Sequence, residues 1–175
     1  MSKGGDAPDA MAKRFGYALK RAQHALRIVM DDELRPLALT TPQYAVLTAL
    51  EAEPGMSNAK LARAAFVTPQ TMHGLLTTLA SAGLLARDPD PGHGRILRTQ
   101  LTDRGRSVLA EAHRCVATVE DDMLASLGQA ASVHITAALM RCADDLLVRK
   151  RITAVGVKPN GCDLSTNGGF RLDRS

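Results

Sequence analysis

Residues 57–85, SNAKLARAAFVTPQTMHGLLTTLASAGLL, decide the fold. Ser57 is a favourable N-cap, and the apolar spacing after it predicts a short helix over 58–65. Thr68 is a second N-cap, and the proline after it suits the first helical position, so a second helix is expected over 68–82. Two capped helices this close together in the sequence predict a helix-turn-helix.

The second of these helices has two unlike faces. Its apolar side chains recur at helical spacing and are expected to face a core, whereas short polar side chains occupy the opposite side. A brief turn, Phe66-Val67, precedes it, and Gly83 ends it. A helix N-terminus with short polar side chains can enter the major groove of DNA, where its free N–H groups contact phosphates.

Beyond Gly83 the apolar residues alternate, which indicates extended chain. Short strands are expected over 84–87 and 95–101. Between them, 88–94 reads DPDPGHG and predicts a turn-rich loop of about seven residues. A hairpin with such a tip is typical of a wing, which can carry a basic side chain into the minor groove.

Upstream, helical spacing of apolar residues over 8–34 predicts a long amphipathic helix that ends before Pro36. Thr40 and Gln43 have the spacing of a capping box, in which the two side chains satisfy helix-terminal N–H groups reciprocally. The helix that this box opens is expected over 41–52.

Downstream, Thr102 opens a helix expected over 102–127, which would reach roughly 38 Å at 1.5 Å per residue. That length exceeds what the core of one small domain needs. A last helix is expected over 130–150, and the chain from Ile152 onward, rich in Gly, Asn and Ser, is expected to be a tail.

Composition restricts the function classes. Of the 175 residues 45% are hydrophobic and 23% charged, which suits a folded domain with appended helices. Neither a long apolar run nor an apolar region at the N-terminus is present, so we expect a cytoplasmic protein without a secretory signal. A net charge of +4 is compatible with a polyanionic partner, and a content of 3% aromatic residues argues against stacking on single-stranded nucleic acid.

Cysteine and histidine usage favours no metal site. The three cysteines show no CxxC spacing, and the five histidines show no ligand-like pairing. Cys115 and Cys142 occur in apolar helical stripes, where buried packing is the default expectation. Cys162 falls in the tail, where it is either an incidental thiol or a redox site.

The stretch from Leu39 to Gly105 resembles the MarR family of winged-helix transcriptional regulators. The resemblance lies in the order and spacing of short motifs rather than in any one of them. One departure is at the wing, where the family often has Asp-Arg-Arg and this chain has His93-Gly94-Arg95. The residues that carry the resemblance are Leu39-Thr40, Gln43, Leu61-Ala62, Val67-Thr68-Pro69, Leu79, Gly83-Leu84, Arg87, Asp90-Pro91, Arg95 and Leu101-Thr102-Asp103-Arg104-Gly105.

The resemblance implies a mainly α fold with a small β-hairpin wing. It also implies a homodimer that binds double-stranded operator DNA as a repressor, the family's most frequent role, with the first and last helices forming the dimer. The expected organisation is a disordered N-terminus 1–9, a dimerisation helix 10–35, a winged helix-turn-helix lobe 36–104, linker and dimerisation helices 105–150, and a tail 151–175.

Several residues of the lobe are candidates for DNA contact. Gln can bond adenine, Thr can touch a thymine methyl group or a phosphate, and the family's wing arginine reaches the minor groove. Gly74, inside the recognition helix, suggests a close approach of DNA or of a neighbouring helix. The DNA-binding candidates are Lys60, Thr68, Gln70, Thr71, His73, Thr78, Arg95 and Arg98.

Many members of the family bind a small aromatic or phenolic effector between the dimer region and the lobe. The matching candidates here are Tyr17, His24 and Tyr44, and no cofactor is expected. Two alternatives stay open: a winged-helix protein-interaction module without DNA binding, and a regulator that responds to oxidation at Cys162. No nucleotide-binding or nucleophile motif favours an enzyme.

Overall fold

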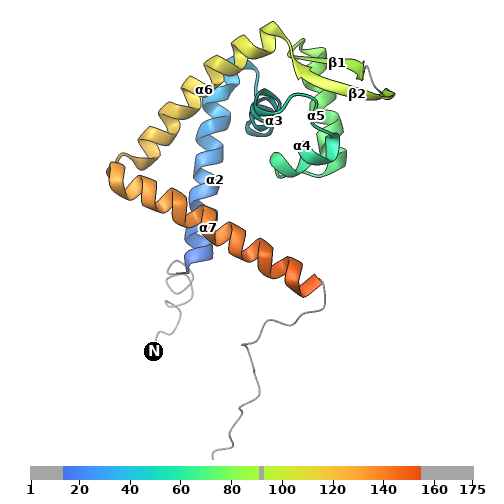
Figure 1. The fold of residues 1–175 in the computed structure, drawn as a ribbon. Helices are drawn as coiled ribbons and strands as arrows, with labels where there is room; N and C mark the ends of the chain where they lie inside the picture. Colours follow the sequence, from blue (N-terminus) through green and yellow to red (C-terminus); the bar gives the residue numbers. More distant parts are fainter. Residues whose placement is uncertain (1–13, 91–92, 155–175) are drawn as a thin grey trace, which may run out of the picture. The chain divides into compact units, whose positions relative to one another are not determined.

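The computed structural model describes residues 14–90 and 93–154, with side chains for 14–87 and 98–150. The chain forms two units, one ending at Ser126 and one beginning at Leu127. The first unit contains a helical lobe with a two-stranded hairpin, together with a long helix that precedes it (Figure 1). The elements of this unit are α2 (Phe15–Leu34), η1 (Arg35–Leu37), α3 (Thr41–Ala52), α4 (Asn58–Ala64), α5 (Pro69–Ser81), β1 (Leu85–Asp90), β2 (His93–Leu101) and α6 (Asp103–Leu124).

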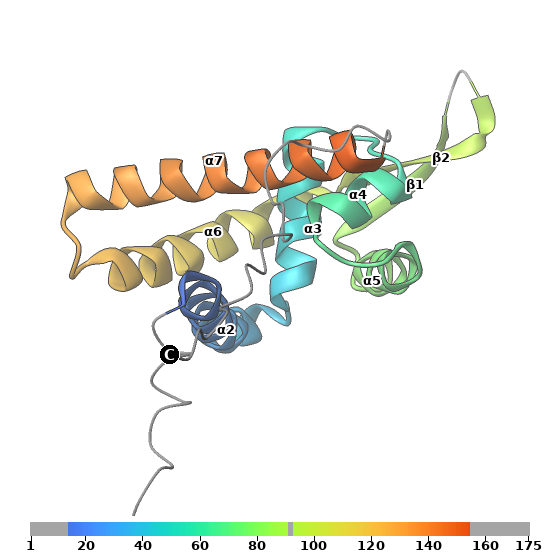
Figure 2. The ribbon, with the colours of Figure 1, turned by 90° about the horizontal axis from the view of Figure 1, so that it is seen from below.

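The helix-turn-helix is confirmed. Ser57 and Thr68 are the N-caps of α4 and α5, and Pro69 is the first residue of α5. Each helix of the lobe contributes a leucine-rich face to the core beneath these two helices. Helix α2 packs against α6 next to this core (Figures 1 and 2). The largest fully buried side chains are Leu34, Val46, Leu47, Leu50, Leu61, Met72, Leu76, Leu79 and Leu109.

The expected bounds of the long helices need correction. Arg14 has extended backbone, so α2 begins at Phe15 and not near residue 8 or 10, while 1–13 lie outside the described residues. The linker helix α6 ends at Leu124, before the expected 127.

The wing also differs from its expected form. Strands β1 and β2 reach Asp90 and His93, so most of the expected loop over 88–94 is paired strand. Proline is tolerated there because both strands of a two-stranded ribbon are edges, with alternate N–H groups facing outward. Pairing changes register between Pro89 and Asp90, so residues 94–96 of β2 have no partners on β1. The backbone of Arg95 lies within this irregular segment.

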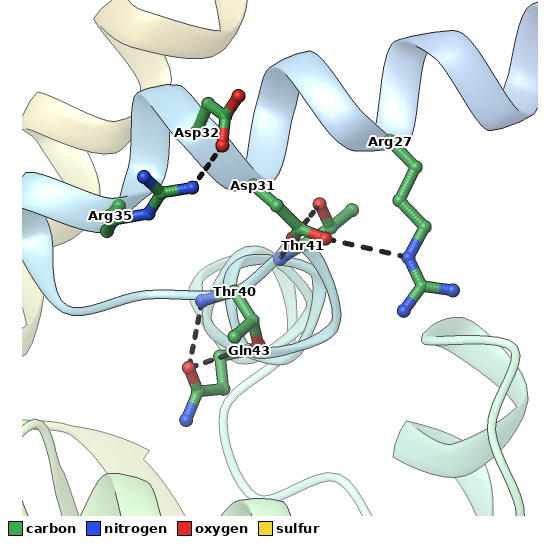
Figure 3. Close-up of polar contacts among 7 residues, drawn as sticks. All are labelled: Arg27, Asp31, Asp32, Arg35, Thr40, Thr41 and Gln43. Atoms are coloured by element: carbon green, nitrogen blue, oxygen red, sulfur yellow. Dashed lines mark hydrogen bonds and ion pairs between the residues drawn. The ribbon is translucent and has the colours of Figure 1, made fainter.

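The junction between α2 and α3 is polar and well satisfied (Figure 3). The side-chain oxygen of Gln43 accepts from the Thr40 N–H at 2.9 Å, as the capping box requires. Asp31, on α2, accepts from both the N–H and the hydroxyl of Thr41, each at 2.7 Å. Burial acts to raise the pKa of Asp31, but the hydrogen bonds from Thr41 and the nearby Arg27 guanidinium outweigh it and lower that pKa below its usual value.

Thr102 closes the lobe between the end of α5 and the start of α6. Its hydroxyl donates to the Gly83 carbonyl at 2.7 Å and accepts from the Gly105 N–H at 2.9 Å. The Thr102 N–H also donates to the Leu84 carbonyl at 3.1 Å. The Leu-Thr-x-x-Gly pattern of the sequence therefore fixes where the wing returns to the helical core.

In its described residues the second unit forms helix α7 (Gln129–Ala154), which continues past the expected end at 150 and into the predicted tail. Cys142 is exposed on it and Cys115 on α6 is half-buried, so the expected burial of Cys142 does not hold within the described chain. Among the described helices, none alone has the length and hydropathy of a membrane span; only α6 and α7 taken together would reach them. The exposed large apolar side chains of α7 are Val133, Ile135, Leu139, Met140, Leu146, Leu147 and Val148.

Candidate nucleic-acid interface

Helix α5 exposes a continuous polar face. Its apolar residues Met72, Leu76 and Leu79 are almost completely buried, which fixes the rotation of the helix about its axis. The opposite face then consists of residues at spacings of three and four, as one face of a helix requires. Those exposed residues are Gln70, Thr71, His73, Gly74, Thr77 and Thr78.

The first turn of α5 is held by side-chain caps. The Thr68 hydroxyl accepts from the Thr71 N–H at 3.1 Å, and the two threonine hydroxyls lie 2.8 Å apart. From α4, the Asn58 amide donates to the Pro69 carbonyl at 3.2 Å and joins the two helices. Thr68 and Thr71 thus have a structural role in the free chain as well as an exposed position near the helix N-terminus.

Further along α5 the threonine hydroxyls bond to the backbone. Thr77 donates to the His73 carbonyl at 3.0 Å, and Thr78 donates to the Gly74 carbonyl at 3.1 Å. A Cβ added to Gly74 would meet nothing within 4 Å, so no neighbouring helix explains this glycine within the described chain. Of the two reasons considered for Gly74, the approach of a helix is therefore excluded.

The basic candidates are placed differently from one another. The Lys60 ammonium forms an ion pair with the Glu53 carboxylate, so a phosphate would have to compete with that carboxylate. Arg98 is exposed midway along the hairpin, opposite Asp88, and its side chain runs alongside Gly55. Arg95 lies in the irregular part of β2, and its side chain is outside the described side chains.

Tyr44 belongs to a polar network between α3 and α6. Its hydroxyl lies 2.9 Å from His113 Nδ1, and His113 Nε2 lies 3.0 Å from a Glu51 carboxylate oxygen. A carboxylate can only accept, so Nε2 donates to Glu51, and in the neutral imidazole the Tyr44 hydroxyl then donates to Nδ1. Burial, together with the charges of Glu120 and Glu51, raises the pKa of Tyr44 and keeps this phenol protonated.

Tyr17 and His24, two of the three effector candidates, line one pocket. This pocket of about 350 Å³ on α2 is lined by Tyr17, Lys20, Arg21 and His24. A second pocket, of about 450 Å³, lies between α2 and α6 and is apolar except for Asp122. Tyr44 lines neither of these two pockets.

Three features were missed from the sequence. Lys20 and Arg21 are ordinary surface cations in a helix, so the sequence gives no signal that they line a pocket. His113 is 69 residues from Tyr44, so no local pattern predicts their contact. The sequence pattern predicts only a turn at Phe66, whereas the structure shows its side chain 96% exposed. A bulky residue between two capped helices, where a glycine is common, is the signal that could have found it. Cys162 lies outside the described residues.

Comparison with known proteins gives consistent matches. A family model described as MarR family matches residues 39–96. The HTH-type transcriptional repressor Rv2887 of Mycobacterium tuberculosis is 41% identical over 113 residues, 65% of this chain and 81% of that protein. The crystal structure of that protein with salicylic acid has a TM-score of 0.64 at 36% identity, covering 74% of this chain and 96% of the other. The transcriptional repressor CouR, bound to a 23-mer DNA duplex, has a TM-score of 0.72 at 31% identity, covering 82% and 99%.

Proposed function

The chain belongs to the MarR family of winged-helix regulators, and from that premise we propose that it represses transcription as a homodimer on a pseudo-palindromic operator. The observation that carries the proposal is the polar face of α5. Its exposed side chains are short and hydrogen-bonding, while the apolar side of the same helix is anchored in the core. A regulator of chromosomal genes acts in the cytoplasm, and no enzymatic activity is proposed.

We assign the contacts by their positions on the lobe. Gln70 and His73, exposed near the start of α5, reach base edges in the major groove, while Thr68 and Thr71 meet phosphates at the helix N-terminus. Thr78, about two turns beyond Thr71, lies further along the same major groove. These contacts divide into those that read bases and those that position the helix.

The basic residues supply the remaining contacts. Arg95 enters the minor groove from the wing, and Arg98, midway along the hairpin, contacts the DNA backbone. Lys60 reaches a phosphate only after leaving Glu53. Residues 56–104 carry six Lys or Arg against three Asp or Glu, whereas 105–150 carry five against six, which agrees with a DNA-binding lobe.

The test of this reading is base preference. An operator is selected from random duplexes with the unaltered chain, and affinities of Gln70→Ala for all single-base variants are measured by fluorescence anisotropy. We expect the preference at one position of each half-site to relax by about 1–3 kcal/mol, with smaller changes elsewhere. Gln129→Ala, on α7, is the matched control. A uniform loss at every variant would show that Gln70 touches only phosphate.

We further propose that the effector is a small aromatic acid bound on α2. The relative crystallised with salicylic acid supplies the ligand class. Of the two pockets, the one lined by Lys20 and Arg21 suits a carboxylate, and Tyr17 offers a ring for stacking. The apolar pocket holds Asp122, whose charge would repel an acid.

Release of the operator by salicylate tests the effector site. We expect Arg21→Gln to raise the salicylate concentration for half-release about tenfold, the factor for one lost charge-assisted hydrogen bond. DNA affinity without salicylate should stay unchanged, and Arg114→Gln on α6 should behave as the unaltered chain. Equal sensitivity of Arg21→Gln and the unaltered chain would refute the site.

A further inference from the structure

Phe66 lies in the turn between α4 and α5 and is the most exposed large apolar residue among the side chains that the structure describes. Its side chain is 96% exposed, and its backbone has φ +54°. A bulky side chain in this left-handed region is disfavoured because Cβ crowds the following carbonyl oxygen. The chain therefore keeps a strained backbone to present a ring that contributes nothing to its own core.

The local hydrogen bonds show why the backbone turns this way. The Val67 N–H donates to the Ala62 carbonyl at 3.0 Å, and the Phe66 N–H donates to the Arg63 carbonyl at 3.3 Å. This is the Schellman pattern that ends a helix, and Phe66 occupies its left-handed position, where glycine is the favoured residue.

The same pattern ends two other elements of the lobe, with smaller residues at the left-handed position. At the end of α5 the residue is Gly83 with φ +69°, and at the end of η1 it is Ala38 with φ +54°. These ends show that the turn itself needs no side chain of this size. The described fold therefore gives no structural reason for an aromatic ring at position 66.

The position of Phe66 indicates its partner. It lies two residues before Thr68, the N-cap of α5, and three after the exposed Arg63. Its exposed neighbours are polar or small, so the ring is a single apolar point and not the apolar patch that a protein interface needs. In DNA, the thymine methyl group and the deoxyribose both offer apolar surface beside the phosphates.

Resting on the DNA-binding function proposed above, we propose that the Phe66 ring is an apolar contact to operator DNA at the edge of the major groove. It packs on a thymine methyl group or on a deoxyribose next to the first turn of α5. The contact adds affinity from the helix-turn-helix turn, separate from the polar face of α5 and from the wing.

Stability and affinity should change in opposite directions in Phe66→Gly. Glycine relieves the left-handed backbone, so we expect the melting temperature to rise by about 2–4 °C. Loss of the ring, which the DNA would cover in the complex, should weaken binding to the selected operator on the order of tenfold. Ala38→Gly is the matched control, because it relieves the same left-handed backbone away from the proposed interface. Its melting temperature should rise as well, and its operator affinity should stay unchanged.

Operators with single thymine-to-deoxyuridine changes distinguish the two DNA surfaces. If one change weakens the unaltered chain but not Phe66→Gly, the ring contacts that methyl group; if none does while Phe66→Gly still binds weakly, it contacts deoxyribose. Unchanged operator affinity in Phe66→Gly overturns the proposal and leaves a protein partner for the ring. Failure of the unaltered chain to select any duplex would instead overturn the proposed function.

Discussion

At the scale of single residues, two glycines of the lobe have opposite surroundings. A Cβ added to Gly105, in the first turn of α6, would lie 2.1 Å from the Leu84 carbonyl oxygen, a backbone atom that cannot easily move. A Cβ added to Gly74, in α5, would meet nothing within 4 Å. Gly105 is therefore required by the fold, whereas Gly74 lowers the stability of α5 in the chain without DNA.

The alanine variants should separate these roles. We expect Gly105→Ala to lower the free energy of unfolding by about 3 kcal/mol, through overpacking against backbone. Gly74→Ala should raise it by about 0.5–1 kcal/mol, because alanine is the better helix former. Denaturant unfolding measures both. A destabilised Gly74→Ala would mean that α5 packs differently, and a fully stable Gly105→Ala would refute the close contact with Leu84.

Residue-scale prediction from the sequence succeeds where the interaction is local. The N-caps Ser57 and Thr68 and the capping box at Thr40 depend on residues three apart, so they can be read directly. The Tyr44–His113 contact depends on how α3 meets α6, and the Lys60–Glu53 pair depends on the turn before α4. Those partners require the tertiary fold.

At the scale of elements, the junction of α2 and α3 rests on Asp31. Its two hydrogen bonds from Thr41 cap α3 from outside the helix. We expect Asp31→Ala to lower the free energy of unfolding by about 1 kcal/mol at pH 7. Asp32→Ala, which removes a surface ion pair with Arg35, should cost less than about 0.5 kcal/mol.

The Asp31 contribution should also depend on pH. Because the folded-state pKa of Asp31 is lowered, its stabilisation is complete above the unfolded-state pKa and is lost as pH falls through the folded-state value. The difference between the unaltered chain and Asp31→Ala should therefore shrink in acid. A difference that stays constant down to pH 3 would show that the carboxylate charge plays no part.

The wing carries the charged contact that we propose for Arg95. We expect Arg95→Ala to weaken binding to all duplexes and to reduce the salt slope by about one, because one minor-groove cation is lost. Titrations at several salt concentrations measure this. An unchanged slope would contradict the assignment of Arg95 to the groove.

Prediction of elements was good for helices and poorer for the hairpin. Capped helices with regular apolar spacing have local signals, so α3 has the expected bounds and α5 differs only at its ends. The Asp88-Pro89-Asp90 sequence indicates a loop, but pairing across the ribbon overrides that local preference. The beginning of α2 was also misplaced, since a helical pattern does not mark where the first turn forms.

At the scale of the whole molecule, several large apolar side chains on the described parts of α2 and α7 stay mostly exposed in the single chain. Phe15 is 65% and Leu146 67% exposed, and MarR regulators are dimers. We expect Leu146→Asp to dissociate the dimer, because a charge in an apolar interface is left unpaired. Analytical ultracentrifugation measures this, with Ala59→Asp on α4 as the control. A dimer of unchanged stability would exclude Leu146 from the interface.

Two copies of this chain are expected to bind one specific duplex through paired lobes. The most direct measurement is the stoichiometry and salt dependence of binding to the selected operator and to a scrambled duplex of equal length. We predict two chains per operator, an affinity for it at least about a thousandfold higher than for the scrambled duplex, and a steep loss with salt. Equal affinity for both duplexes, or one chain per operator, would contradict the account.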